Sequence, residues 1–358
     1  MLSRRSFLQT AGVAGAALLA APLLEACSRG QQQLLFQNWT DYIDPSILVT
    51  FQQQEGITAS YQTYVSNDEL QRRLVSATAG RRRGRTGVTF DLMVPSENFV
   101  RRFHELGLLE PVNAGTLSNI GNLDPAFRTQ GFDPGNMYTI PWATGTTGIG
   151  YDRTVVKEPP DWTVFGDDRY KGRMTVLDEE RDAFGAALLS LGLDPNTTSQ
   201  QEIDAARDQL LKWKGVIKGF DSDYQSALAD GTIVLAHAYS GDVLQAKATN
   251  PDLEFVLPKQ GGLRWVDSLA VPVDASHLDS ARTFMNFYLQ PEISAANANA
   301  IRYDTANKAA VPLLDPDVRN DPVIFPPPDV LARLSFTADL GPDIEALYAK
   351  AWAQVLSG

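Results

Sequence analysis

The sequence predicts an α/β fold, and two observations support this. Of its 358 residues, 44% are hydrophobic and 21% are charged, which is the composition of a globular protein and excludes a chain disordered over its whole length. Short apolar runs rich in β-branched and aromatic residues alternate with segments of helical period. Strands that alternate with helices indicate an α/β architecture with largely parallel sheets.

The short apolar runs predict buried strands. A glycine-rich stretch, Gly145–Gly150, lies between two of them and lacks the spacing of a dinucleotide-binding loop. We therefore interpret this stretch as a tight chain reversal between two lobes. The expected strands are Leu34–Trp39, Ile57–Tyr64, Phe90–Pro95, Thr139–Trp142, Gly148–Tyr151, Met174–Leu177, Ile233–Tyr239, Phe255–Pro258 and Ser268–Val271.

Segments with helical period lie between these strands, and Gln201–Lys214 is the clearest of them. Its residues Ile203, Ala206 and Leu210 share one face, and Ser199 is placed to cap its first turn. The other expected helices are Asn67–Thr78, Glu97–Leu106, Ser280–Leu289, Pro291–Ala300 and Pro342–Leu356.

The N-terminus has the features of an export signal. Arg4 and Arg5 have twin-arginine form and precede an apolar run, Thr10–Leu24, which is shorter than the roughly 20 residues that a membrane-spanning helix needs. The run ends in Leu-Glu-Ala-Cys, which resembles a lipoprotein signal-peptidase site. We expect Cys27 to become the lipidated first residue, although a buried free thiol is the alternative. The predicted segments are the export signal, 1–26, and a polar tether, 27–33.

The charge balance excludes some partners and favours others. The 43 acidic residues outnumber the 31 basic ones, for a formal charge of -12, which argues against a nucleic-acid partner and favours a cationic ligand. There is one cysteine, and the three histidines, His104, His237 and His277, have no metal-binding spacing. The sequence therefore predicts no disulfide framework, no metal site and no cofactor.

Aromatic and acidic residues stand two positions apart at two strand ends. Trp39 and Asp41 follow one strand, and Trp265 and Asp267 precede another, at positions where α/β sheets place ligands. An alkyl amine needs carboxylates for its ammonium groups and flat aromatic walls for its methylenes. This pairing favours an organic cation. The alternative is that both tryptophans belong to the core and both acids form caps or turns.

A catalytic interpretation has less support. The sequence contains no GxSxG motif, and no histidine has a recognisable active-site setting. Glu179, Asp182 and Asp267 leave open a pair of carboxylates acting as general acid and base. The sequence therefore predicts a protein that is not an enzyme, with a surface enzyme using this acidic cluster as the alternative.

The chain resembles the spermidine/putrescine-binding proteins of polyamine ABC importers over nearly its whole length after the signal. The strings that carry the resemblance are FQNWTDYIDPSIL, FDLMVPS, GNLDPAF, IPWATGTTGIGYD, LDEERDAF, PKQGGLRWVDSLAVP and RTFMNFYLQPEI. The resemblance implies a two-lobed type II periplasmic-binding-protein fold, with lobes that are discontinuous in sequence and a ligand cleft between them. The implied boundaries are 34–143 plus about 266–312 for lobe 1, and 144–265 plus about 313–358 for lobe 2.

The resemblance also implies the ligand-binding residues. This chain has an acid at every position where the family has one. Three positions depart from the family: Asn98 replaces a tyrosine, Tyr239 a tryptophan and Thr337 a glutamine. Smaller side chains at these positions bury less of the ligand's methylene surface. This favours a shorter diamine such as putrescine, or little discrimination between putrescine and spermidine. Arg302 has no obvious place near a cation. The implied ligand-binding residues are Trp39, Thr40, Asp41, Tyr42, Ser96, Asn98, Glu179, Asp182, Tyr239, Trp265, Asp267 and Thr337.

The sequence thus predicts an exported, lipid-anchored and monomeric binding protein on the outer face of the cytoplasmic membrane or in the periplasm. It would capture putrescine or spermidine and deliver it to the permease of a membrane ABC importer. The alternatives within binding proteins are another organic cation, an opine or a metal complex.

Overall fold

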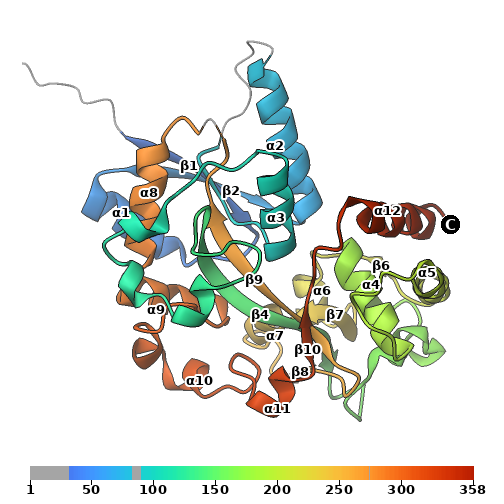
Figure 1. Cartoon of the computed structure of the whole chain (residues 1–358). Coiled ribbons are helices and arrows are strands. Elements are labelled where there is room, and N and C mark those ends of the chain that lie inside the picture. Colours follow the sequence, from blue (N-terminus) through green and yellow to red (C-terminus); the bar gives the residue numbers. More distant parts are fainter. Residues whose placement is uncertain (1–31, 83–89, 274) are drawn as a thin grey trace, which may run out of the picture. The chain divides into compact units, whose positions relative to one another are not determined.

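The structure is a computed structural model that describes residues 32–82, 90–273 and 275–358. The predicted export signal and Cys27 lie outside the described residues. Residues 32–358 form one unit in which helices flank a mixed β-sheet (Figure 1), so the predicted α/β class is confirmed. The strands are β1 (Gln33–Trp39), β2 (Thr58–Tyr64), β3 (Leu92–Met93), β4 (Thr139–Asp152), β5 (Met174–Val176), β6 (Gly219–Phe220), β7 (Leu235–Tyr239), β8 (Leu253–Val256), β9 (Gly262–Ala270) and β10 (Leu334–Phe336).

The described strands join in the order β2-β1-β3-β9-β4-β7-β5-β6, with β10 paired to β9 and β8 paired to β4. Strands β2, β1 and β3 are parallel, as are β6, β5 and β7. Strand β4, however, is antiparallel to β7, β8 and β9. The prediction of largely parallel sheets is therefore wrong in the middle of the sheet, where the paired strands run in opposite directions and need no helical crossover.

The predicted chain reversal at Gly145–Gly150 is also wrong, because β4 runs through it without a break and joins two strands that we predicted separately. The glycines instead make room for neighbours. A Cβ atom at Gly145 would lie 2.4 Å from the Trp265 ring and 2.8 Å from the Tyr303 ring, and one at Gly148 would lie 2.5 Å from the Val256 carbonyl oxygen. The glycines are there for tertiary packing and not for a turn.

The helices begin and end with the expected local signals in some places only. Asp44 caps α1 through Ser46 N, at 2.8 Å, and Gly56 ends it in the left-handed conformation. Ser199 stands at the N-cap of α5 but makes no side-chain capping bond, so that expected contact is absent. The helices are α1 (Pro45–Glu55), α2 (Asn67–Arg82), α3 (Glu97–Glu105), α4 (Glu180–Ser190), α5 (Gln200–Lys214), α6 (Gln225–Ala229), α7 (Ser240–Ala246), α8 (Leu278–Tyr288), α9 (Pro291–Ile301), α10 (Pro316–Arg319), α11 (Pro328–Leu331) and α12 (Pro342–Ser357).

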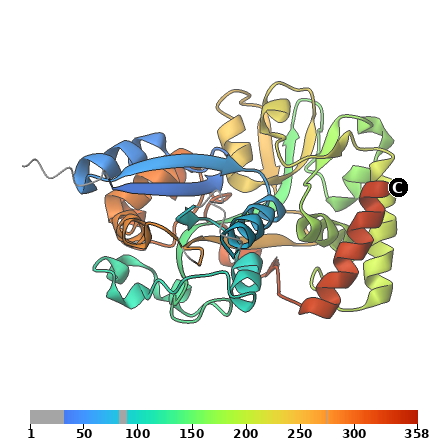
Figure 2. The same ribbon diagram turned by 90° about the horizontal axis from the view of Figure 1, so that it is seen from above.

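The buried hydrophobic residues form separate clusters, one of which includes residues from the first half of β4 and another residues from its second half. We call the clusters drawn from residues 34–143 and 269–306 block 1, and those drawn from residues 149–253 and 348–355 block 2. In Figure 2, α12 lies beside α5 in block 2. The lobe boundaries that we predicted after residues 143 and 265 fall inside β4 and β9.

Candidate functional site

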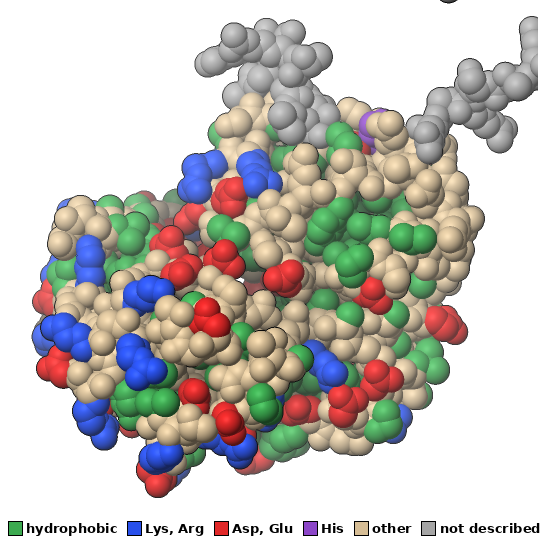
Figure 3. Space-filling view, turned by 180° about the vertical axis from the view of Figure 1, so that it is seen from behind, with side chains coloured by type: hydrophobic (Ala, Val, Ile, Leu, Met, Phe, Trp, Pro, Cys, Tyr) green, Lys and Arg blue, Asp and Glu red, His purple; other side chains and the backbone are tan. Residues whose placement is uncertain are grey.

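A cavity of about 320 Å³ lies where several helices begin. Block 1 contributes the end of β1 and the first turns of α2 and α3, block 2 contributes the first turns of α4 and α7, and β9 crosses between them. Acidic side chains border the hollow seen in Figure 3. The first turns carry Asp68, Glu97, Glu180, Asp182 and Asp242, where the positive end of each helix dipole favours a carboxylate.

The structure brings together eleven of the twelve predicted ligand-binding residues. Asp41 is the exception. It is exposed, has a φ of 53°, and does not line the cavity. The residues that do line it are Trp39, Thr40, Tyr42, Ser96, Asn98, Glu179, Asp182, Tyr239, Trp265, Asp267 and Thr337.

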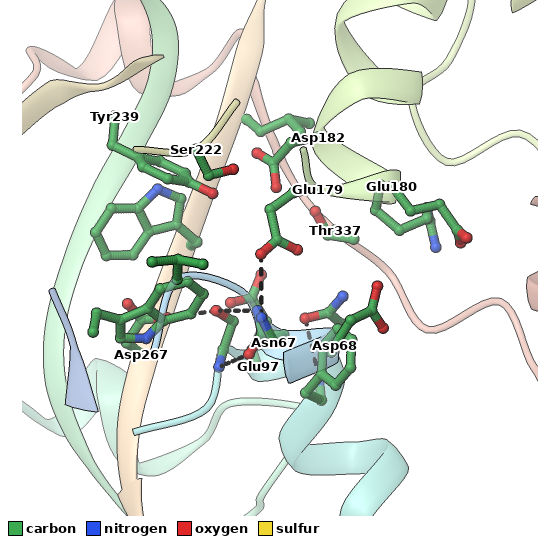
Figure 4. Close-up of a pocket in the computed structure, with 18 of the residues that line it drawn as sticks. Asn67, Asp68, Glu97, Glu179, Glu180, Asp182, Ser222, Tyr239, Asp267 and Thr337 are labelled. Carbon is green, nitrogen blue, oxygen red and sulfur yellow. Dashed lines mark hydrogen bonds between the residues drawn. The ribbon is translucent and has the colours of Figure 1, made fainter. Parts of the chain in front are cut away.

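A chain of hydrogen bonds crosses the cavity between the two blocks (Figure 4). The Ser96 hydroxyl donates to Asp267 Oδ1 at 2.6 Å, and Asn67 Nδ2 donates to Ser96 Oγ at 3.1 Å. The Asn67 backbone N–H then donates to Glu179 Oε1 at 3.2 Å. Asn67 therefore connects the carboxylate on β9 with the carboxylate that precedes α4.

The acids in this cavity are held away from water, and this changes their ionisation. Burial raises the pKa of Asp267 to about 7, although the hydroxyls of Ser96 and Tyr42 lower it in part. Burial raises the pKa of Asp182 to about 6. Burial, and then the charges of Asp182 and Asp68, raise the pKa of Glu179 well above its usual range. Burial therefore favours the neutral form of each acid, although the charge of Arg181 opposes this in part at Asp182.

Aromatic rings form one wall of the cavity around Trp265. Its ring centroid lies 5.1 Å from that of Tyr303, 5.9 Å from that of Tyr239 and 6.4 Å from that of Tyr42. On the block 1 side, Trp39 Nε1 donates to the Val94 carbonyl at 2.8 Å. These flat rings beside carboxylates form the kind of surface that an alkyl ammonium ion contacts favourably.

Positive side chains also line the cavity, but each already has a partner. Arg181 Nη1 lies 2.7 Å from Glu345 Oε1, and Arg102 Nη2 lies 3.3 Å from Glu345 Oε2. The Arg264 guanidinium lies 4.3 Å from the centre of the Phe336 ring. Glu345, at the edge of this cavity, thus takes up Arg181 and Arg102, and neither arginine pairs with Glu179, Asp182 or Asp267. Arg302, for which we expected no role near a cation, pairs with Asp317 on the surface at 2.6 Å.

Sequence reasoning missed several residues of this cavity. The acids among them share one signal, which is a position in the first turn of a helix that follows a strand. That signal is weak, because acids are common there simply as helix-stabilising residues. Tyr303 donates to Asp242 Oδ1 at 2.7 Å, a contact between distant segments that no local pattern indicates. The missed residues include Asn67, Asp68, Glu97, Glu180, Asp242 and Tyr303.

Other kinds of site find little support in the described residues. They contain no group of three or more His, Cys, Asp or Glu side chains arranged to hold a metal ion. Among the described helices, none has both the length and the apolar composition that crossing a membrane requires. The cavity can offer carboxylates, aromatic faces and hydroxyl groups to a ligand, which suits the recognition of a cation.

Comparison with known proteins agrees with this geometry. Residues 46–326 match the family described as bacterial extracellular solute-binding protein. The chain belongs to this family. The solute-binding protein is 32% identical to the spermidine/putrescine-binding periplasmic protein of Salmonella typhimurium, over 96% of this chain and 97% of that protein. It is 34% identical to the putrescine-binding periplasmic protein PotF of Escherichia coli, over 97% and 96% of the two chains.

A solved structure is similar over the same extent. The spermidine/putrescine ABC transporter substrate-binding protein PotD of Streptococcus pneumoniae has a TM-score of 0.75 and 30% identity, with 91% of this chain and 99% of that chain covered. The resemblance identified from the sequence strings is therefore confirmed, and so is the periplasmic-binding-protein fold that it implied.

Proposed function

We propose that this solute-binding protein binds a polyamine, putrescine or spermidine, in the cavity between blocks 1 and 2. The observation that carries the proposal is a set of buried carboxylates beside aromatic walls, without paired cations. A buried carboxylate without a counter-ion is costly, and an incoming ammonium group relieves that cost. The names of the relatives from Salmonella typhimurium and Escherichia coli support the same class of ligand.

The charge of the cavity separates this proposal from its alternatives. An opine carries carboxylate groups that these acids would repel. A diamine or triamine matches the lining of the cavity, because its charged nitrogens can pair with the acids and its methylenes can contact the aromatic rings.

The protein's place in the cell follows from the same proposal. It is exported by the signal at residues 1–26, is anchored by lipid at Cys27, and acts as a monomer that delivers its ligand to the permease of an ABC importer. It has no catalytic role and returns its ligand unchanged. Blocks 1 and 2 correspond to the two predicted lobes, which close on the ligand.

Titration calorimetry and thermal unfolding of the purified protein test the ligand class. We expect putrescine or spermidine to raise the unfolding temperature and to bind with one site, whereas glutamate and agropinic acid do neither. Asp329→Asn is a matched control, since Asp329 is exposed on α11 and away from the cavity. Binding of the anions in preference to both amines would refute the proposal. Chemical change of the amine during incubation would favour the alternative of a surface enzyme.

A further inference from the structure

Glu97 is a buried carboxylate of the cavity that the resemblance does not identify as a ligand-binding residue. It is the first residue of α3, is 5% exposed, and accepts a hydrogen bond from Val266 N at 2.9 Å through Oε2. Val266 stands between Trp265 and Asp267 on β9. Glu97 therefore lines the cavity against the part of β9 that carries Trp265 and Asp267 (Figure 4).

No positive side chain pairs with Glu97 in the described part of the chain. Its neighbours on α3 point elsewhere: Arg101 Nε lies 2.8 Å from Asp339 Oδ2, and Arg102 pairs with Glu345. Arg264 attracts Glu97 electrostatically but stacks on Phe336 and forms no ion pair with it. Burial, together with the smaller effect of the charges of Asp267 and Asp182, raises the pKa of Glu97 to about 8.

The number of acids exceeds what a diamine can compensate. Besides Asp68, Glu180 and Glu345, five buried or half-buried carboxylates line the cavity, and none of the five has an ion pair with a described side chain: Glu97, Glu179, Asp182, Asp242 and Asp267. The hydrogen bonds that Glu97, Glu179, Asp242 and Asp267 accept come from neutral donors. Two ammonium groups leave more of these acids without a counter-ion than three do. We infer that Glu97 binds an ammonium group of the ligand and sets a preference for an amine with three ammonium groups over one with two.

This inference rests on the proposed function and opposes one expectation from the sequence. The smaller side chains at Asn98 and Tyr239 reduce the apolar contact with methylenes, which alone favours a shorter diamine. Glu97 immediately precedes Asn98 and adds a charged contact. A hydrogen bond between ions is roughly twice as strong as one between neutral groups, so the contact from Glu97 acts against the effect of the smaller side chains on ligand preference.

Two variants separate ligand binding from a structural role. Glu97→Gln removes the charge but keeps an oxygen that accepts from Val266 N, whereas Glu97→Asp keeps the charge and shortens the reach to β9. Glu105→Gln is the matched control, because it removes an acid from the exposed end of the same helix. Titration calorimetry with spermidine and putrescine, at pH 8, measures the ratio of the two affinities. Thermal unfolding shows that each variant is folded.

We expect the wild type to prefer spermidine and Glu97→Gln to weaken spermidine binding at least about tenfold, with putrescine changed less than about threefold. Glu97→Asp and Glu105→Gln should keep the preference. Equal losses for both amines in Glu97→Gln, or loss of the preference in Glu97→Asp alone, would overturn the assignment and leave polyamine binding standing. A wild type that binds neither amine would refute the proposed function itself, and this inference with it.

Discussion

Replacing Asp267 by asparagine should make the empty protein more stable and the ligand-binding site weaker. Asp267 is 5% exposed and accepts a hydrogen bond from Ser96, which asparagine can still accept through its side-chain oxygen. In the folded protein, burial raises the pKa of this acid from 3.8 to about 7. A tenfold change in acid strength corresponds to about 1.4 kcal/mol, so Asp267 costs up to about 4 kcal/mol when it is ionised.

The sign of this effect depends on pH. Between about pH 4 and pH 7 the unfolded chain loses the Asp267 proton while the folded protein keeps it, so this acid makes the free energy of unfolding fall as the pH rises. Below this range the acid is neutral in both states and the cost disappears. Asparagine does not titrate. The stabilisation by Asp267→Asn should therefore be largest at pH 8 and small at pH 4.

Binding should change in the opposite direction. Removing one partner of a buried ion pair typically costs about 3 to 5 kcal/mol, so Asp267→Asn should weaken putrescine and spermidine binding about a hundredfold or more. Urea unfolding at pH 4 and pH 8 measures the stability, and titration calorimetry measures the affinity. An unchanged affinity would show that Asp267 does not bind the ligand's ammonium group. A variant less stable than the wild type at pH 8 would show that Asp267 is not an unpaired, destabilising charge in the empty protein.

The site supports three further predictions. Burial raises the pKa of Glu97 to about 8 and that of Asp267 to about 7 in the empty cavity, so amine affinity should rise from pH 5 to pH 8 and protons should be released on binding near pH 7. Calorimetry in buffers of different ionisation enthalpy measures this release, and no release would contradict the prediction. Gly145→Ala would place a Cβ atom 2.4 Å from the Trp265 ring and should weaken amine binding about tenfold, while Gly115→Ala, which has open space, should not. Asn67 N and Glu179 Oε1 meet across the blocks at 3.2 Å, so the radius of gyration from small-angle scattering should fall when the amine binds, and an unchanged radius would argue against closure.

The sequence predicted the parts of the fold that depend on local pattern. The helical period of Gln201–Lys214 and the apolar run Leu34–Trp39 match α5 and β1 closely. The glycines led to the wrong prediction of a turn within β4. Gly145 lacks a side chain because Trp265 and Tyr303, from other segments, approach its backbone closely. A single sequence shows a glycine but does not show which distant side chain needs the space.

The candidate site, like the fold, could be predicted from the sequence only in part. Trp39 and Tyr42 lie at or just after the end of β1, and Trp265 and Asp267 belong to β9, so the order of residues along the chain was enough to indicate a site there. Asp41 belongs to the same run, but its positive φ leaves it exposed and outside the cavity wall. A run of neighbouring residues thus predicts where a site lies better than it predicts which side chains enter it.

The buried acids without a counter-ion give a physical reason for the proposed coupling of ligand binding to closure of the two blocks. Asp267 lies on β9 between the blocks, whereas Glu179 precedes α4 in block 2, and the hydrogen bonds through Ser96 and Asn67 join them across the cavity. Closing the empty cavity takes these carboxylates out of water and costs free energy, which protonation reduces. Under the proposed closure, an ammonium group removes that cost in the closed form, where both blocks surround it. The differential affinity that drives closure therefore comes from the same buried acids that recognise the ligand.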